Sequence, residues 1–267
     1  MNILSIILTL GLFNCIGQQA TINSISKPHK ISGDTLVGIS KLLKYYPQIK
    51  KYKNNRIYFG DGSSLVYKDS SKNKTFQQLL DNPDLNDQFK YAYVKGKPSN
   101  KIEKYYDPGR IRNEKFFRKI YGNSKEEVRK NLVEIVWCPK LINGRILITR
   151  VNGIDQKVKE ISAELDEMPE YKEYLKNIGG TFSWRLINGT NRLSMHSFGM
   201  TIDINTSFSN YWQWDCKCLN EDATLGYKNK IPQKIIDVFE KHGFIWGGKW
   251  YHYDTMHFEY RPELIDN

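Results

Sequence analysis

Long apolar segments are scarce in this chain of 267 residues. A membrane helix needs about 18 or more consecutive apolar residues, whereas the apolar run at residues 3–13 is shorter and no other segment approaches that length. We therefore expect no transmembrane span once a leader is removed. The short run beside the initiator predicts a signal peptide over residues 1–19, although the basic residues that usually precede such a run are missing.

Cysteine is also rare, with four in the chain. Cys15 follows the apolar run, and Leu12 stands three residues before it, which is typical of a relaxed bacterial lipoprotein cleavage site; the alternative is a plain cysteine in a discarded leader. Both interpretations predict an exported protein, periplasmic or associated with the cell envelope. The first adds a lipid anchor through Cys15.

The remaining cysteines are Cys138, Cys216 and Cys218. Cysteines two residues apart do not easily bond to each other without strain, so the simple disulfide would join Cys138 to one of the pair. A metal site at Cys216 and Cys218 would lack the usual second pair of ligands. We interpret these cysteines as structural or idle.

Acidic residues are outnumbered, with 29 Asp and Glu against 40 Lys and Arg, for a net charge of +11. Such an excess is informative about partners rather than fold. Export would remove the protein from nucleic acid, so we expect no nucleic-acid partner. The excess then indicates either an anionic envelope surface as a partner or a lysine-rich, solvated face.

Internal repeats and low-complexity tracts are absent from the sequence. Residues 20–100 carry short patterned pieces, including a hairpin at 56–67, and form an expected N-terminal accessory region that ends in a linker at 95–100. Residues 101–267 form the expected catalytic domain. In that domain we expect helices at 126–136, 155–176 and 231–242, and strands at 145–151, 181–185, 200–205 and 256–260. Short strands around a block of helices predict an α+β fold with a small, mostly antiparallel sheet.

Histidine is scarce too, with five in the chain. His29 and His242 need no functional explanation. His196 comes shortly before a strand on which Asp203 shares a face with Thr201 and opposes an apolar face. A carboxylate on such a strand is costly unless something pairs with it, and Gly199 can supply the bend that returns His196 to the face of Asp203.

The second cluster is Asp254-Thr255-Met256-His257-Phe258-Glu259. On a strand that starts at residue 256, His257 and Glu259 share a face, and Asp254 lies on the turn before it. Two imidazoles and one carboxylate suit zinc (Zn2+) and leave a fourth position for water, whose pKa the metal lowers to about 7. Asp254 is then available as the base that takes the proton of the water and later protonates the leaving amine.

The pattern Ser-x-His-x-x-Gly-x-x-x-Asp, followed by Asp-x-x-His-Phe-Glu, resembles the zinc peptidase family that contains VanY-type D-alanyl-D-alanine carboxypeptidases and L-alanyl-D-glutamate endopeptidases. The resemblance implies that His196, Asp203 and His257 bind zinc and that Asp254 is the catalytic base. It also implies the hedgehog/D-Ala-D-Ala peptidase fold. Thr201 stands where the family usually has alanine, a small replacement that we expect to be tolerated.

The resemblance further implies an arginine upstream of the first motif that holds the substrate carbonyl. Arg185 fits best, because it follows an aromatic residue on an expected strand, and Arg192 is the runner-up and a candidate substrate contact. Ser194 is a candidate hydrogen-bond donor to a ligand or to the substrate. Trp250 ends a glycine-containing loop, 246–250, that we expect to line the cleft. Residues 211–214 are either an aromatic wall for the substrate or part of the core.

The sequence therefore predicts an exported zinc metallopeptidase that hydrolyses a peptide bond in peptidoglycan stem peptides. Whether it is a carboxypeptidase or an endopeptidase stays open. The alternative is a non-catalytic, zinc-containing binding or adhesion module of the envelope on the same fold. Asp254 discriminates between the two, because a binding module has no need of a base beside the metal.

Overall fold

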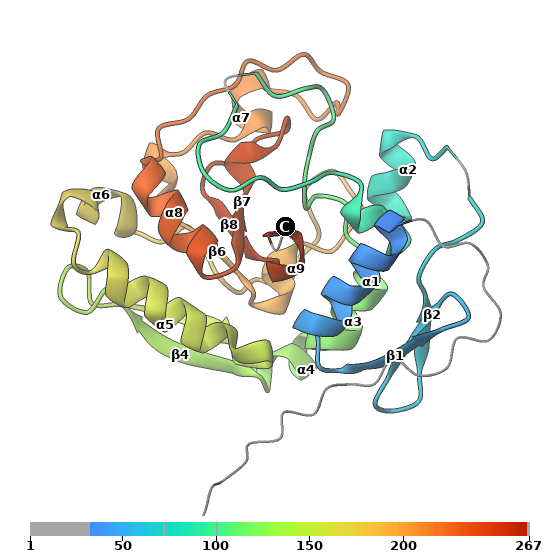
Figure 1. Ribbon diagram of the computed structural model, residues 1–267. Coiled ribbons are helices and arrows are strands. Elements are labelled where there is room, and N and C mark those ends of the chain that lie inside the picture. The colour runs from blue at the N-terminus through green and yellow to red at the C-terminus, as the bar shows by residue number, and fades with distance from the viewer. Residues whose placement is uncertain (1–32, 72, 100, 266–267) are drawn as a thin grey trace, which may run out of the picture. The chain divides into compact units, whose positions relative to one another are not determined.

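The computed structural model describes residues 33–71, 73–99 and 101–265 (Figure 1). These residues lie within one compact unit, Ser32–Asn267. The expected signal peptide, Cys15 and His29 fall outside the described residues. Within the part that is described, no helix has the length and apolar character needed to cross a membrane.

Helices and short strands alternate along the described chain. The helices are α1 (Gly33–Tyr45), α2 (Phe76–Asp81), α3 (Glu114–Tyr121), α4 (Lys125–Arg129), α5 (Ile154–Leu165), α6 (Lys172–Leu175), α7 (Trp212–Cys216), α8 (Gln233–Lys241) and α9 (Pro262–Ile265). The strands are β1 (Ile49–Lys53), β2 (Arg56–Phe59), β3 (Ser64–Val66), β4 (Leu132–Trp137), β5 (Gly144–Thr149), β6 (Thr201–Asp203), β7 (Phe244–Trp246) and β8 (His257–Tyr260). All of the paired strands among them are antiparallel, which confirms the predicted α+β class with small antiparallel sheets.

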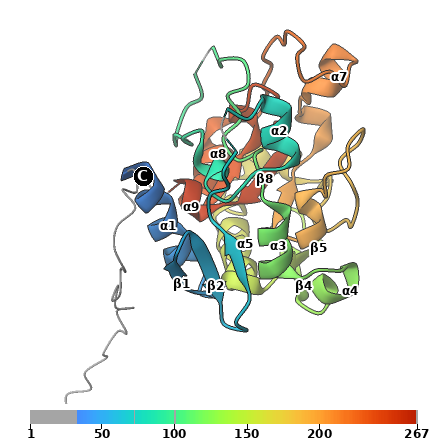
Figure 2. The same cartoon turned by 90° about the vertical axis from the view of Figure 1, so that its right-hand side faces the viewer.

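The N-terminal part of the described chain is a meander of β1, β2 and β3 beside α1. The hairpin expected at 56–67 is confirmed as β2 and β3. Helix α1 packs against β1 and against the C-terminal helix α9 (Figure 2). Tyr46, directly after α1, donates a 2.8 Å hydrogen bond to Glu263 in α9, so the two ends of the described chain are joined by a buried polar contact.

One hydrophobic cluster includes residues from both sides of the expected boundary near residue 100. Tyr46 and Ile57 come from the first part, and Phe117 and Phe258 from the second. The division into an accessory region and a catalytic domain stays a prediction about the sequence. The described residues of both parts contribute to a common core.

The sheet that carries the functional motifs has the strand order β6-β8-β7. All four residues of β8 are buried, because this strand lies between the other two. Phe258 on β8 stacks on Phe239 of α8 with ring centroids 3.9 Å apart, which fixes one face of the sheet against that helix. The opposite face, with His257 and Glu259, is left for polar groups.

The helix expected at 126–136 is wrong beyond its first turn. Helix α4 begins after Ser124, whose side chain accepts from the backbone N–H of Glu127, and it ends at Arg129. Residues 132–137 form β4 instead, because Ile135 and Trp137 turn one face inward while the chain pairs along its whole length with β5. Helix α5 covers the hairpin of β4 and β5 (Figure 1).

Two further expectations need correction. The helix expected at 155–176 ends at Leu165, and a short turn opened by Pro169 separates it from α6. The strand expected at 181–185 is not a strand: Ser183 donates its backbone N–H to the His196 carbonyl, and that of Arg185 goes to Ser197 Oγ. These two hydrogen bonds hold the segment alongside the turn that carries His196. Strand β7 was not predicted.

Candidate metal centre

His196 lies on a buried 3-10 turn, Met195–Phe198, that leads into β6. Ser194 caps this turn, because its hydroxyl accepts from the backbone N–H of His196. The turn ends at Gly199, whose φ of +64° is in the left-handed region, and a Cβ there would lie 2.5 Å from Leu132 Cδ2. Glycine is thus required both for the conformation and for the close approach. The expected bend between His196 and β6 is present.

Asp203 and His257 are partners across the antiparallel pair β6 and β8. Asp203 Oδ1 lies 2.9 Å from His257 Nδ1, and Asp203 Oδ2 lies 3.1 Å from His196 Nε2. One ligand atom from each of the three residues lies within 4.8 Å of the others. Three side chains that are remote in sequence therefore converge on one point.

The hydrogen bonds of the two imidazoles fit a metal site. His196 Nδ1 is 2.9 Å from the Thr181 carbonyl oxygen, so donation there leaves the Nε2 lone pair toward Asp203. His257 Nε2 is 3.3 Å from Glu259 Oε2, and donation there leaves Nδ1 toward Asp203. Such outer partners fix the tautomer of ligating histidines. The donor set of two imidazole nitrogens and a carboxylate oxygen suits zinc and other divalent transition metals.

The pKa values of Asp203 and His257 are shifted, because these largely buried groups lie close to one another. Burial raises the pKa of Asp203, but the His196 charge and the hydrogen bonds from His196 and His257 outweigh it and hold that pKa below its usual range. Burial lowers the pKa of His257, yet its hydrogen bonds to Asp203 and Glu259 raise it to about 10. A cation bound between these groups would displace that proton, so metal and proton compete for one position.

Asp254 lies on the turn before β8, beside this cluster. Its backbone N–H donates to the Gly247 carbonyl, and its own carbonyl accepts from His257 N. A Cβ on Gly247 would come within 2.5 Å of the Asp254 carbonyl oxygen, so the glycine permits this close approach. Asp254 Oδ1 is buried and has no hydrogen-bond partner among the described residues. Burial and the charge of Asp203 raise the Asp254 pKa to about 6.

Glu259 is the outer partner of His257 and is itself fully buried. Arg112 binds it through two nitrogens, at 2.6 and 3.2 Å, and Arg261 adds a third contact at 3.1 Å. The charge of Arg112 offsets the burial that would raise the Glu259 pKa, and the net pKa lies below its usual range. Glu259 therefore stays ionised and orients His257. The alternation His-x-Glu on one strand face was a signal for this partner, whereas nothing in the sequence pointed to Arg112.

Of the other predicted site residues, Trp250 and Ser194 lie next to the predicted ligands, whereas Arg185 and Arg192 have their contacts elsewhere. The Trp250 ring lies 5.7 Å from that of His257 between centroids, and Arg112 stacks on its face. Ser194 caps the His196 turn. Arg185 is exposed, and its guanidinium donates a 3.4 Å hydrogen bond to the Leu186 carbonyl. Arg192 contacts acids outside the metal cluster.

Of the aromatic residues in the segment 211–214, one belongs to the core and another is exposed as an aromatic wall for the substrate would be. Trp212 is buried against His252, with ring centroids 4.8 Å apart, whereas Trp214 is 57% exposed. Tyr211 bridges to Asp254 through the backbone, and its ring contacts that of Trp214. Burial and the Asp254 charge raise the Tyr211 pKa, while the charges of Arg110 and Arg185 oppose the rise. Tyr211 thus lies within electrostatic reach of both Asp254 and Arg185.

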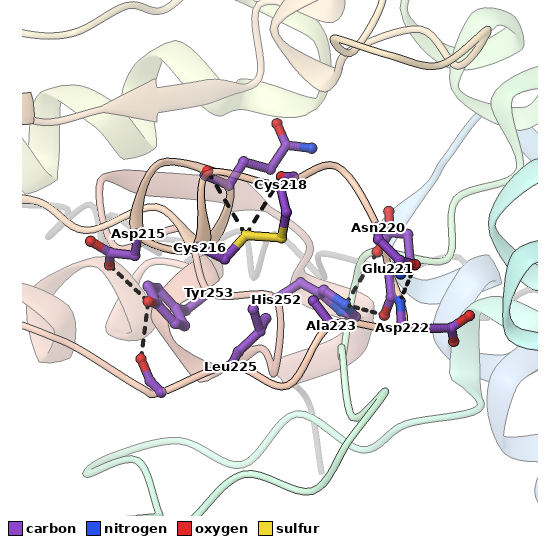
Figure 3. Close-up of a disulfide and its surroundings, with 12 residues drawn as sticks. Asp215, Cys216, Cys218, Asn220, Glu221, Asp222, Ala223, Leu225, His252 and Tyr253 are labelled. Carbon is purple, nitrogen blue, oxygen red and sulfur yellow. Dashed lines mark hydrogen bonds and ion pairs between the residues drawn. A yellow bond between two sulfur atoms is a disulfide. The ribbon is translucent and has the colours of Figure 1, made fainter.

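The disulfide is not the simple one, from Cys138 to one of the other two cysteines, that the sequence offered. Cys216 and Cys218 form a disulfide with a Cα–Cα distance of 5.2 Å, and Cys138 is a buried free thiol. Lys217, between them, adopts the left-handed conformation at the end of α7, and this turn brings the two cysteines together. Figure 3 shows the disulfide at the start of the loop that runs over His252 and Tyr253.

His252 has a structural explanation. It is fully buried, with Nδ1 2.6 Å from Asp107 Oδ2 and Nε2 2.9 Å from the Glu221 carbonyl oxygen. His242 is likewise engaged, with Glu160 and Glu164 at 3.0 and 2.6 Å. Neither histidine takes part in the metal cluster.

Two histidines and an aspartate that could hold a metal ion therefore lie beside an unpartnered carboxylate, in a fold of small antiparallel sheets and helices. Residues 188–260 match the family model of D-alanyl-D-alanine carboxypeptidase. The match confirms the family resemblance predicted from the motifs, supports a peptidase, and covers His196, Asp203, Asp254 and His257. No curated protein and no solved structure matches the chain.

Proposed function

We propose that this protein is a zinc metallopeptidase that hydrolyses a peptide bond in peptidoglycan stem peptides after export to the periplasm or cell envelope. The observation that carries the proposal is the convergence of His196, Asp203 and His257 beside the unpartnered Asp254 carboxylate. The matched carboxypeptidase family supports a stem peptide as substrate. The net charge of +11 favours an anionic envelope as the surrounding partner.

In this proposal His196, Asp203 and His257 would hold the zinc ion, with His196 Nε2 and His257 Nδ1 as the nitrogens that face Asp203. When bound, the ion supplies Lewis acidity, which lowers the pKa of a water and polarises the substrate carbonyl. Asp254 takes the proton of the attacking water with its unpartnered oxygen. It then returns this proton to the departing amine nitrogen, so that the carboxylate is restored at the end of the cycle.

Arg185 is assigned to the developing negative charge on the carbonyl oxygen. Its guanidinium is exposed and makes a long, 3.4 Å hydrogen bond to the Leu186 carbonyl, so a substrate can compete for this donor. A charged donor placed there is worth about 3–4 kcal/mol of transition-state stabilisation, by analogy with oxyanion donors. Trp250 packs beside His257 and lines the site.

Digestion of purified muropeptides, followed by mass spectrometry, tests the proposal. Loss of one terminal D-alanine identifies a carboxypeptidase, and cleavage after L-alanine identifies an endopeptidase. Asp254→Asn should slow formation of either product by about a hundredfold or more, whereas Asp237→Asn, a change at an exposed acid on α8, should not. Intact muropeptides after incubation with zinc-loaded native protein would rule out the enzyme and favour the binding module.

A further inference from the structure

A cavity of about 150 Å3 lies between α2, the segment 110–115 and the segment 187–193. A cavity of that size holds a group of about the size of benzene. Its lining includes Met195 and Phe198, which belong to the same 3-10 turn as His196. The pocket therefore borders the element that carries the first predicted ligand.

A second connection runs through Arg112, which also lines the cavity. Arg112 binds Glu259, and Glu259 orients His257. His196 is thus linked to this pocket through the turn that carries it, and His257 is linked through Glu259 and Arg112. A group bound in the pocket would therefore contact neighbours of the two histidines, while none of the three predicted ligands lines the pocket.

The lining is rich in cations, and two of them are already neutralised. Arg110 is bound by Asp107 at 2.7 Å and by Glu221 at 2.9 Å, and Arg112 is bound by Glu259. Lys115 is exposed and has no ion pair among the described residues. Arg192 is the cation in the lining that is both desolvated and poorly matched with acceptors.

The guanidinium of Arg192 has only long contacts with acids. Nη2 is 3.4 Å from Glu221 Oε1, an oxygen that Arg110 already binds at 2.9 Å, and Nη1 is 3.5 Å from Asp81 Oδ1 without hydrogen-bond geometry. Nε and Nη1 are buried and have no hydrogen-bond partner among the described residues. Burial and the neighbouring Arg110 lower the Arg192 pKa. A buried charged donor without an acceptor is costly, so an acceptor supplied by a ligand would be favoured.

The acids in the lining do not supply that acceptor. Asp81 is 50% exposed and accepts from Gln77, and Glu114 accepts from Arg118 and from the backbone N–H of Leu193. One desolvated positive charge is therefore incompletely balanced. A single negative charge matches it better than the double charge of a phosphate group would.

We propose that this pocket binds a free carboxylate of the peptide substrate, with Arg192 as its principal donor. The proposal rests on the proposed function for the identity of the substrate, while the pocket itself is argued from the geometry above. Arg192 turns toward the carboxylate and donates the N–H groups that lack acceptors, in the paired geometry that guanidinium and carboxylate favour. Arg192 is then a specificity residue and not the donor to the carbonyl.

Two carboxylates of a stem peptide fit this chemistry. One is the C-terminal carboxylate of a D-alanine, as a carboxypeptidase requires. The other is the free carboxylate of a D-glutamate next to the cleaved bond, as an endopeptidase requires. Peptides in which one or the other group is amidated separate these two sources.

Acetate is the probe for the binding test, and acetamide is its neutral control. The side-chain Nε–H signal of Arg192, identified by its absence in Arg192→Gln, is followed by NMR in the zinc-loaded protein. We expect acetate to shift this signal in a saturable way and acetamide to leave it unchanged. Asp81→Asn removes a competing acid at the rim, so it should tighten acetate binding by about two- to fivefold.

The kinetic test compares native protein, Arg192→Gln and Arg145→Gln. Arg145 is an exposed partner of Glu134 on the β4–β5 hairpin and serves as the matched control. Loss of a charged hydrogen bond should raise KM by about ten- to a hundredfold for the peptide that carries the recognised carboxylate, with little change in kcat. The amidated form of that peptide should show almost no difference between the variants.

Two results would overturn the proposal: an Arg192 signal indifferent to acetate, or an acetate affinity that Asp81→Asn leaves unchanged or weakens. Calorimetric titration with acetate compares Asp81→Asn with the native protein, so this result decides the matter even where Arg192→Gln does not fold. If no peptide is hydrolysed by the native protein, the proposed function fails, while the NMR titration still decides whether the pocket binds a carboxylate.

Discussion

Asp203 and His257 face each other across the antiparallel strands β6 and β8, and Asp203 Oδ1 lies 2.9 Å from His257 Nδ1. The register of two short strands thus places a carboxylate and an imidazole from distant parts of the chain in one cluster. A shift of β8 by one residue in this register would send His257 to the apolar face and away from Asp203. The stack of Phe258 on Phe239 opposes such a shift, because it fixes the apolar face of β8.

The first prediction concerns the base. Asp254→Asn keeps the shape of the side chain and removes its ability to take a proton. We expect kcat to fall by about a hundredfold to ten-thousandfold, with zinc content unchanged. Steady-state hydrolysis and elemental analysis of the same sample measure both quantities. Unchanged kcat would show that Asp254 is not the base.

The pH profile follows from the same residue. The Asp254 pKa is raised to about 6 by burial and by Asp203, and a bound cation would lower it. The base acts only when deprotonated, so kcat/KM should fall as the pH drops through a limb at or below pH 6. Zinc content must be followed at each pH, because protons compete for His257. An acid limb above pH 7 in fully loaded protein would contradict the assignment.

The outer partner of His257 provides the third prediction. Glu259→Gln retains the size of the side chain but weakens its hold on the imidazole, and zinc affinity should fall by about 10- to 100-fold. Competition with a chelator measures this affinity. Glu134→Gln, at an exposed position on β4, is the matched control. If both variants bound zinc as the native protein does, Glu259 would have no orienting role.

Arg185 is predicted to act on the transition state. Arg185→Gln should lower kcat by about 100- to 1000-fold with a smaller effect on KM, because the donor is needed most when charge develops on the carbonyl oxygen. Arg145→Gln should leave both constants unchanged. A rise in KM alone would reassign Arg185 to ground-state binding of the substrate.

The bend at Gly199 is open to a stability test. Gly199→Ala places a Cβ at a φ of +64° and 2.5 Å from Leu132 Cδ2, and it should lower the free energy of unfolding by about 1–3 kcal/mol. Gly226→Ala meets no atom within 4 Å and should have little effect. Chemical denaturation of both variants provides the comparison. Equal stabilities would mean that the turn adjusts without cost.

The sequence predicted the cluster better than its surroundings. The alternation of His257 and Glu259 on a strand and the spacing from His196 to Asp203 are local patterns, and the structure brings the three predicted ligands together. Arg112 could not be found in this way, because its contact with Glu259 joins residues far apart in the sequence and depends on tertiary packing.

Local conformation explains the other differences. The later part of the helix expected at 126–136 is strand β4. Pairing with β5 and burial of Ile135 and Trp137 outweigh the helical spacing of the sequence there. The disulfide between Cys216 and Cys218 was discounted on separation alone, whereas the left-handed Lys217 allows it. Both outcomes depend on backbone geometry that composition and periodicity do not encode.

The most direct test of the account is the metal content of protein purified without chelators. One equivalent of zinc per chain is expected in the native protein and in His242→Ala, and none in His196→Ala or His257→Ala. Native protein without a bound divalent metal, or full zinc occupancy in both ligand variants, would contradict the metal centre and the peptidase mechanism built on it.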